Sequence, residues 1–308
     1  MEGAGPAVKR QWSGDVSPRL VEESTPVAVR ASGDRGERLA RPGEPSGDGT
    51  SPPLTVVVLA AGTGRRINSG SSGGPKWLLP IGEQRIADLQ LHAVEQSAAW
   101  VSRVVVVTGH QQAEINAYLA VRASGLSCTT VNNPLYDVRN NWFSLAIGLR
   151  DLAADETVVI INSDLVTGDR ILERFLQSAA SMRCEVLLAV DDDRPLTREA
   201  MKVAARSLPS GDLALTGIGK TGVTDPIGEY IGIAAVRPSA VPKLMDVLAA
   251  HELDVSRHDR WYDLAFADLA AAGVDVRLWS TGSSCWVEVD DQADLEAAQG
   301  LATRGIPE

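Results

Sequence analysis

The sequence is poor in the residues that build disulfide frameworks and zinc sites. Its 308 residues include four histidines and three cysteines, and Cys128, Cys184 and Cys285 lie far apart in the chain. No cysteine stands near another at the spacing of metal ligands, so neither kind of site is expected. We interpret the cysteines as small, buried apolar side chains.

Long apolar runs are also missing. None approaches the roughly 20 residues that cross a bilayer, and the opening residues, MEGAGPAVKRQWSGDVSPRL, lack the apolar segment of a secretory signal. We therefore expect a cytoplasmic protein without a membrane partner. The net charge of −11 argues against a nucleic-acid partner as well.

Apolar residues make up 44% of the chain, enough for the core of one large domain. They are unevenly distributed. Residues 1–53 are rich in Gly, Pro, Ser, Arg and Glu without apolar periodicity, which predicts a disordered N-terminal extension. The periodic pattern begins at Leu54, and we assign residues 54–303 to a single folded domain.

Buried strands and helices alternate through that domain. The strands are predicted at 54–60, 104–109, 128–132, 157–164, 185–190 and 274–280, and the helices at 84–99, 111–122, 141–152, 169–182, 238–250, 261–272 and 291–302. Weak alternation over 197–236 indicates antiparallel strands or a small inserted antiparallel sheet. The pattern predicts a three-layer, mainly parallel (mixed) Rossmann-like α/β sheet with its ligand crevice at the carboxyl ends of the strands.

A glycine-rich stretch with basic residues follows the first strand, over residues 56–82. Exposed backbone N–H groups and cations in such a loop can surround a phosphate. Two familiar versions of the loop do not fit. The dinucleotide fingerprint needs a glycine where Ile67 stands, and the Walker loop needs Gly-Lys-Ser/Thr, whereas Lys76 follows Pro75.

The segments LAAGTGRR and PKWLLPIG resemble the signature of nucleotidyltransferases that activate sugar phosphates and related phosphorylated alcohols. The resemblance implies a GT-A type sheet, with Arg66 and Lys76 as catalytic cations. It implies a nucleotide-binding loop formed by Leu59, Ala60, Ala61, Gly62 and Gly64. The intervening INSGSSGG is longer than in the family, and we interpret it as a lid that orders on the nucleotide.

Acidic residues stand at the end of one strand and near the C-terminus, in INSDL and WVEVDDQADLEAA. Taken alone, Asp164 could equally cap a helix or occupy a surface turn. The resemblance implies that Asp164 and Asp290 hold Mg²⁺, which prefers hard oxygen ligands. Asp291 and Asp294 are expected to cap the closing helix.

NNPLYDVRNNWFSLAIGL, residues 132–149, resembles the bacterial choline-phosphate cytidylyltransferase branch of the superfamily. This resemblance implies that Asn141 and Ser144 lie against the nucleotide base, although simple helix capping is an alternative. Lys202 and Lys220 are candidate phosphate contacts, against the alternative of solvated lysines.

Aromatic residues make up 5% of the chain, yet several lie in or beside the motifs. An aromatic cage with a nearby carboxylate holds a quaternary ammonium, and Tyr262 and Trp286 with Glu229 or Asp263 could build one. Each ring could equally belong to the core. A primary amine would need the carboxylate and fewer aromatics, and a polyol phosphate would need neither.

These features predict a Mg²⁺-dependent cytidylyltransferase. It would couple CTP to a small phosphorylated or phosphonate alcohol or amine, such as phosphocholine or 2-aminoethylphosphonate, and release pyrophosphate. Two alternatives stay open: a sugar-1-phosphate or inositol-phosphate nucleotidyltransferase, and a catalytically silent nucleotide-binding or regulatory protein. The oligomeric state stays open too, a homodimer included.

Overall fold

The computed structural model describes residues 53–305, except 65, 68–73, 123–124, 153 and 169. The predicted disordered extension, apart from residue 53, and most of the predicted INSGSSGG lid lie outside the described residues. Within the described part, no helix has the length and apolar character needed to cross a membrane.

One nine-stranded sheet runs through the described domain. In spatial order its strands are β5 (Ser127–Asn132), β4 (Val101–Thr108), β1 (Leu54–Ala60), β6 (Thr157–Asn162), β11 (Gly228–Val236), β8 (Val186–Asp191), β12 (Val276–Ser280), β10 (Leu213–Gly219) and β9 (Lys202–Ser207). The first four are parallel, and β11 runs antiparallel to both of its neighbours β6 and β8. The predicted mainly parallel, mixed sheet is confirmed.

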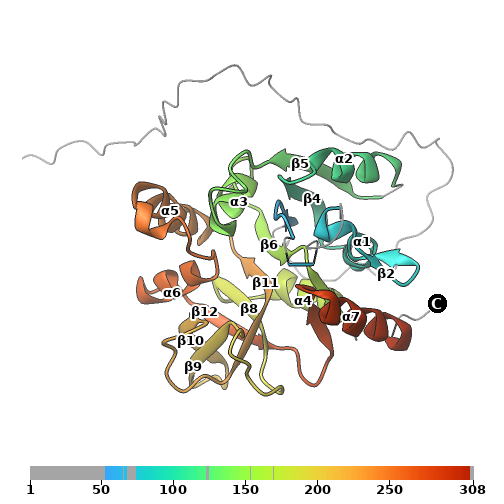
Figure 1. The fold of residues 1–308 in the computed structure, drawn as a ribbon. Coiled ribbons are helices and arrows are strands. Elements are labelled where there is room, and N and C mark those ends of the chain that lie inside the picture. Colours follow the sequence, from blue (N-terminus) through green and yellow to red (C-terminus); the bar gives the residue numbers. More distant parts are fainter. Residues whose placement is uncertain are drawn as a thin grey trace, which may run out of the picture.

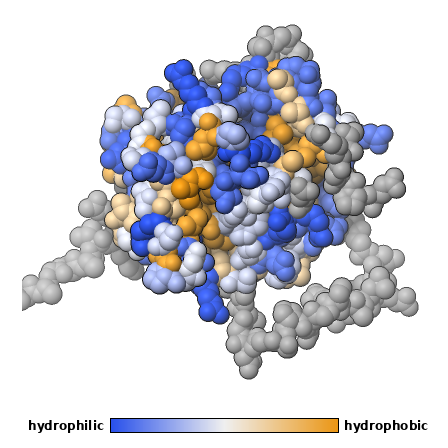
Figure 2. All heavy atoms as spheres, turned by 90° about the horizontal axis from the view of Figure 1, so that it is seen from below, coloured by the Kyte–Doolittle hydropathy of each residue, from blue (hydrophilic) through white to orange (hydrophobic). Residues whose placement is uncertain are grey.

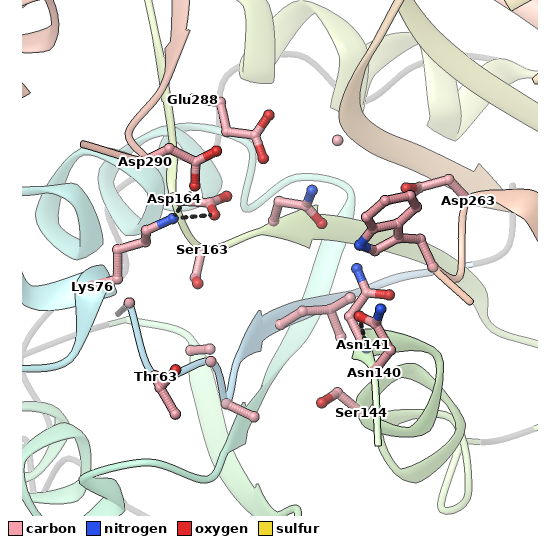
Figure 3. Close-up of a pocket in the computed structure, with 18 of the residues that line it drawn as sticks. Thr63, Lys76, Asn140, Asn141, Ser144, Ser163, Asp164, Asp263, Glu288 and Asp290 are labelled. Atoms are coloured by element: carbon pink, nitrogen blue, oxygen red, sulfur yellow. Dashed lines mark hydrogen bonds and ion pairs between the residues drawn. The ribbon is translucent and has the colours of Figure 1, made fainter. Parts of the chain in front are cut away.

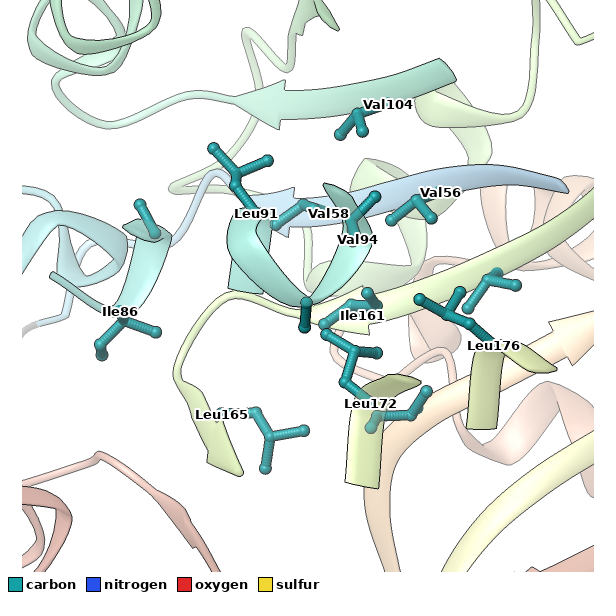
Figure 4. Packing of buried hydrophobic residues seen from close by; sticks show 14 of the residues in the cluster. Val56, Val58, Ile86, Leu91, Val94, Val104, Ile161, Leu165, Leu172 and Leu176 are labelled. Carbon is teal, nitrogen blue, oxygen red and sulfur yellow. The ribbon is translucent and has the colours of Figure 1, made fainter. Parts of the chain in front are cut away.

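Helices cover both faces of the sheet (Figure 1). One face packs against α1 (Ile86–Gln96), α2 (Gln112–Val121), α4 (Ile171–Ser181) and α7 (Gln292–Gly305), and the other against α3 (Asn141–Gly148), α5 (Val241–Leu253) and α6 (Leu264–Ala271). Strand side chains alternate between the two faces. Figure 4 shows Val56 and Val58 of β1 beside Leu91 of α1, in the first of two buried clusters. The predicted three layers are therefore present.

The segment 197–236 forms β9, β10 and the central strand β11. Strand β9 pairs antiparallel with both β10 and β11, so the predicted antiparallel pairing is present. These strands extend the main sheet and do not form a separate one. Gly232 in β11 has a φ of +86°, at a register shift where β11 passes β8.

Several short elements follow no periodic pattern in the sequence, because two or three residues carry no period. They are the 3₁₀ turns η1 (Lys76–Leu78) and η2 (Val255–Arg257), the hairpin β2 (Pro80–Ile81) with β3 (Gln84–Arg85), and the pair β7 (Leu165–Thr167) with β13 (Trp286–Glu288). The interpretation of the cysteines is confirmed for Cys128 and Cys184, which are buried, and wrong for Cys285, which is exposed.

Candidate active site

A pocket of about 400 Å³ opens at the carboxyl ends of β1 and β6, where the sequence predicts the ligand crevice. The loop after β1, the start of α3 and the turns after β6 and β13 line it (Figure 3). A neighbouring recess of about 360 Å³ shares Gly64, Arg66 and Lys76 with it. The two together form a groove that reaches from the glycine loop to the acidic cluster.

Lys76 lies at the centre of that cluster. Its Nζ atom is 2.9 Å from Oδ2 of Asp164 and 2.7 Å from Oδ1 of Asp290. Nη2 of Arg66 lies 2.7 Å from the other oxygen of Asp290, and most of the Arg66 side chain is exposed. The four residues that the sequence singled out for catalysis and metal binding are thus brought together, although 224 positions separate the first from the last.

Backbone pairing explains how such distant residues meet. Strand β13 pairs antiparallel with β7, which places Glu288 opposite Leu165. The amide N–H of Val289 donates to the carbonyl oxygen of Asp164 at 2.9 Å. The turn after β6 and the chain after β13 are therefore held together, and their carboxylates face the same space.

A third carboxylate, Glu288, belongs to the cluster and is missing from the sequence prediction. Ligand oxygens of Asp164, Glu288 and Asp290 all lie within 4.8 Å of one another. The signal was present in the sequence: in extended chain, side chains two residues apart point the same way, and Glu288 is two residues before Asp290. The motif WVEVDD therefore presents two acids to the pocket.

The donor set fits a hard divalent cation. Carboxylate oxygens are the ligands that Mg²⁺ prefers. Oδ1 of Asp164 is buried and has no hydrogen-bond partner among the described residues, so this oxygen is left to coordinate a cation. Asp291 and Asp294 have a different role, because they exchange hydrogen bonds with backbone N–H groups at the start of α7. Their predicted capping role is confirmed.

The acidic cluster shifts the pKa values of its members. Burial by itself would lower the pKa of Lys76, but the charges of Asp164 and Asp290 outweigh it and raise that pKa. Lys76 is therefore a charged ammonium. Loss of water around Glu288, together with the charges of Asp164 and Asp290, raises its pKa to about 8. Asp164 and Asp290 face the cations Lys76 and Arg66, and Glu288 lies beside them, so a divalent ion would meet three carboxyl groups here.

A buried hydrogen-bond system fixes Lys76 relative to Asp164. Trp77, next to Lys76, is fully buried, and its indole N–H donates to Oε1 of Gln90 at 2.9 Å. Nε2 of Gln90 in turn donates to the carbonyl oxygens of Asn162 and Leu165 at 2.9 and 2.8 Å. Those two carbonyls flank Asp164. The side chain of Gln90 in α1 therefore connects the turn that carries Lys76 to the turn that carries Asp164.

The predicted nucleotide residues all line the pocket: Leu59, Ala60, Ala61, Gly62, Gly64, Asn141 and Ser144. Gly64 has a φ of +57°, a conformation that glycine adopts without strain. Oδ1 of Asn141 accepts from the backbone N–H of Tyr262 at 2.9 Å, and Oγ of Ser144 accepts from Asn133 at 2.9 Å. The N-cap of α3 is Asn140, whose Oδ1 accepts from the N–H of Asn141. Capping therefore does not account for Asn141 or Ser144.

The predicted substrate residues divide into two groups. Asp263 lines the pocket and is buried, and its Oδ1 has no hydrogen-bond partner within the described chain. Burial raises the pKa of Asp263 to about 7, and the nearby charge of Lys220 lowers it while that of Asp164 raises it. Figure 3 shows Asp263 on the wall that faces the acidic cluster.

The structure does not bring Lys202, Glu229, Tyr262 and Trp286 into the described lining of the pocket. Lys202 donates to three backbone carbonyls, and its nearest, that of Lys220, is 3.0 Å away. Tyr262 is fully buried. The indole of Trp286 is 5% exposed and donates to Asp191 at 2.7 Å. The aromatic cage predicted from Tyr262 and Trp286 does not form, because both rings are core residues.

Other residues take their place on that wall, namely Glu199, Met201, Tyr230 and Trp261, together with Lys220. Arg139 and Asn162 also line the pocket and are absent from the predicted site residues. Trp261 stands next to the predicted Tyr262, and Lys220 was a candidate phosphate contact. The sequence pattern could not show that Trp261 is exposed and Tyr262 buried, because both residues lie just before α6, where no helical period applies.

This fold and site define a class of protein. An α/β sheet, a glycine loop after its first strand, and a lysine among carboxylates at the strand ends are the features of a nucleotidyltransferase. Residues 56–263 match the model of the MobA-like NTP transferase domain. The chain belongs to this family, which confirms the predicted nucleotidyltransferase superfamily.

The CMP-5'-(3-aminopropyl)phosphonate synthase of Streptomyces rubellomurinus is 28% identical over 257 residues, covering 80% of this chain. This chain spans 38% of that relative's length.

Among solved structures, the CTP:phosphocholine cytidylyltransferase of Streptococcus pneumoniae aligns with a TM-score of 0.62 and 16% identity, over 81% of this chain and 99% of that one. The inositol-1-phosphate CTP transferase of T. maritima aligns with a TM-score of 0.62 and 17% identity, over 82% and 98% of the two chains. At these identities the likeness shows the fold.

Proposed function

We propose that the protein is a Mg²⁺-dependent cytidylyltransferase. It would couple CTP to a small acceptor that carries a phosphonate or phosphate at one end and an amine at the other, and it would release pyrophosphate. The observation that carries this proposal is the ion-paired centre of the pocket, where Lys76 lies 2.9 and 2.7 Å from the carboxylates of Asp164 and Asp290. A charged lysine beside two carboxylates can neutralise a phosphate group next to a bound cation, as the transfer of a nucleotidyl group requires.

In the proposed reaction an anionic oxygen of the acceptor attacks the α-phosphorus of CTP. The bond from that phosphorus to the oxygen of the β-phosphate breaks, and pyrophosphate leaves. The acceptor oxygen is already ionised near neutral pH, so no strong general base is needed. Lys76 would stabilise negative charge at the α-phosphate, and Arg66 with the backbone amides of residues 62–64 would bind the departing phosphates.

Asp164, Glu288 and Asp290 would hold the magnesium ion. When bound, Mg²⁺ neutralises phosphate charge and aligns the reacting oxygens. Asn141 and Ser144, at the head of α3, would lie against the cytosine ring. Both are fixed by hydrogen bonds, 2.9 Å each, to Tyr262 and Asn133, and fixed polar groups are what selection of one base requires.

An amine on the acceptor is supported by Asp263. A buried carboxylate with an unpartnered oxygen is costly to a folded protein unless a ligand satisfies it. An ammonium group would supply both the charge and the N–H donors. The resemblance to a synthase of an aminopropylphosphonate nucleotide supports the same acceptor chemistry.

The proposal is tested by measuring pyrophosphate release with Mg²⁺ and each of the four nucleoside triphosphates. The acceptor panel would contain 2-aminoethylphosphonate, 3-aminopropylphosphonate, phosphocholine, inositol 1-phosphate and glucose 1-phosphate. We expect turnover with CTP and an amine-bearing acceptor. Turnover confined to a polyol or sugar phosphate would show that the acceptor is not an amine. No turnover with any pair would favour a catalytically silent nucleotide-binding protein.

A further inference from the structure

We propose that Lys220 makes the acceptor wall selective for a primary ammonium over a quaternary one, because its side chain covers the ring face that a quaternary ammonium would need. This inference rests on the proposed function, since it concerns the amine of the acceptor. It concerns Glu199, Lys220, Trp261 and Asp263, which line the side of the pocket away from the β1 loop; we call these four residues the acceptor wall.

A quaternary ammonium has no N–H group and is held by the faces of aromatic rings. Three aromatic residues lie near the acceptor wall, and two of them offer no free face. Tyr230 and Tyr262 are 4% and 0% exposed, and their hydroxyl groups are 2.9 Å apart in a hydrogen bond. Trp261 is 37% exposed and lines the pocket. Trp77 and Tyr136 also line the pocket, but Trp77 is 0% exposed and Tyr136 lies at the β1 loop, its ring 5.9 Å from that of His110. A quaternary ammonium on the acceptor wall would therefore depend on Trp261.

The ring of Trp261 already has a cation over it. Nζ of Lys220 lies 4.7 Å from the ring centroid and 3.4 Å from Oε2 of Glu199. The backbone at Lys220 is held as well, because its carbonyl oxygen accepts from Lys202 at 3.0 Å. Lys220 thus occupies, from within the chain, the place that a trimethylammonium group would take.

A primary ammonium does not need that ring. It can donate hydrogen bonds, and Asp263 presents a buried carboxylate whose Oδ1 lacks a partner in the described chain. A small NH₃⁺ group can meet this carboxylate while Lys220 stays over Trp261. Three methyl groups would prevent such hydrogen bonds, and they would need the ring face of Trp261 that Lys220 covers. Both effects favour the primary amine.

Two acceptors that differ in nothing but N-methylation test the inference: 2-aminoethylphosphonate and its N,N,N-trimethyl derivative, each assayed with CTP. We expect wild-type protein to prefer the primary amine by about tenfold or more in kcat/KM. In Lys220→Ala the uncovered ring should narrow this preference by about three- to tenfold. Lys220→Arg, which keeps a cation over the ring, should retain it. Comparing two acceptors on one sample cancels differences in folded fraction.

Two further variants isolate the contact. Lys243→Ala removes a lysine that is paired with Glu185 away from the pocket, at 2.9 Å, and should leave the preference unchanged. Adding Trp261→Leu to Lys220→Ala should abolish the gain for the trimethyl acceptor, because the gain requires the ring.

Equal use of both acceptors by wild-type protein would overturn the inference and leave the proposed function standing. An unchanged preference in Lys220→Ala would also overturn it. Failure of CTP to react with either acceptor, or with any other amine in the panel, would instead remove the proposed function on which the inference rests.

Discussion

Asp263→Asn should make the protein more stable at alkaline pH while it weakens amine recognition. The pKa of Asp263 is raised to about 7 in the folded protein, chiefly by burial, against about 3.9 in an unfolded chain. Below both values the carboxyl is protonated in both states and costs nothing. As the pH rises from about 4 to about 7 the unfolded state ionises first, so folding must take up a proton and stability falls.

The size of the effect follows from the difference between the two pKa values. Each pH unit corresponds to about 1.4 kcal/mol, so the full penalty at about pH 8 is of order 4 kcal/mol. Asparagine keeps the shape and removes the charge. It also removes a negative charge from the N-cap of α6, a loss of about 0.3–1 kcal/mol. We therefore expect a net stabilisation of about 1–3 kcal/mol.

Urea unfolding of wild type and Asp263→Asn at about pH 8 and about pH 5 measures this directly. The variant should be the more stable at the higher pH, and its advantage should be smaller at the lower one, where about 1.5 kcal/mol of the wild-type penalty remains. In parallel, KM for 2-aminoethylphosphonate should rise in the variant, while KM for the amine-free ethylphosphonate should not. A variant that is less stable at both pH values would refute the argument, because Asp263 would then be a satisfied structural residue.

Four further predictions follow from the same geometry. Lys76→Ala should lower turnover by about 10²- to 10³-fold without loss of the cooperative thermal transition, because it removes charge stabilisation from the reacting phosphate; near-normal turnover would exclude the proposed role. Gln90→Leu leaves the carbonyls on either side of Asp164 without a donor and should cost about 2–3 kcal/mol in urea unfolding; an unchanged midpoint would contradict it. Gly232→Ala would place a Cβ 2.6 Å from the side-chain nitrogen of Asn162 at a φ of +86°, and should cost about 1–3 kcal/mol; the thermal midpoint would show no fall if this strain were absent. Mg²⁺ should raise the thermal midpoint of wild type and should raise that of Glu288→Gln less; equal shifts would place the ion elsewhere.

The layers of the fold could be predicted from the sequence because buried strands such as 54–60 are continuous apolar runs. The order of the strands could not, since β11 enters the centre of the sheet antiparallel to β6 and nothing in its composition indicates this. The pairing of the short strands β7 and β13 could not be predicted either. Three residues carry no periodicity, yet this pairing brings Glu288 beside Asp164.

The site residues that belong to a recognisable motif could be predicted from the sequence. Those whose role depends on whether the side chain is buried could not. Lys76, Asp164 and Asp290 meet as expected. Trp286 and Tyr262 have the composition of an aromatic cage, but the packing of β13 and of the chain before α6 buries both. Lys202 and Lys220 are chemically alike, and the sequence does not distinguish them. In the structure Lys202 donates to backbone carbonyl oxygens, whereas Lys220 lines the pocket.

The central claim is the joining of a cytidylyl group to an amine-bearing phosphonate or phosphate. Phosphorus NMR of CTP and 2-aminoethylphosphonate with the protein and Mg²⁺ tests it most directly. The account predicts a pair of mutually coupled phosphorus signals from a new phosphonate–phosphate anhydride, with one pyrophosphate formed for each acceptor consumed, and no such signals with Lys76→Ala. Coupled signals that appear with glucose 1-phosphate and with no amine-bearing acceptor would contradict it.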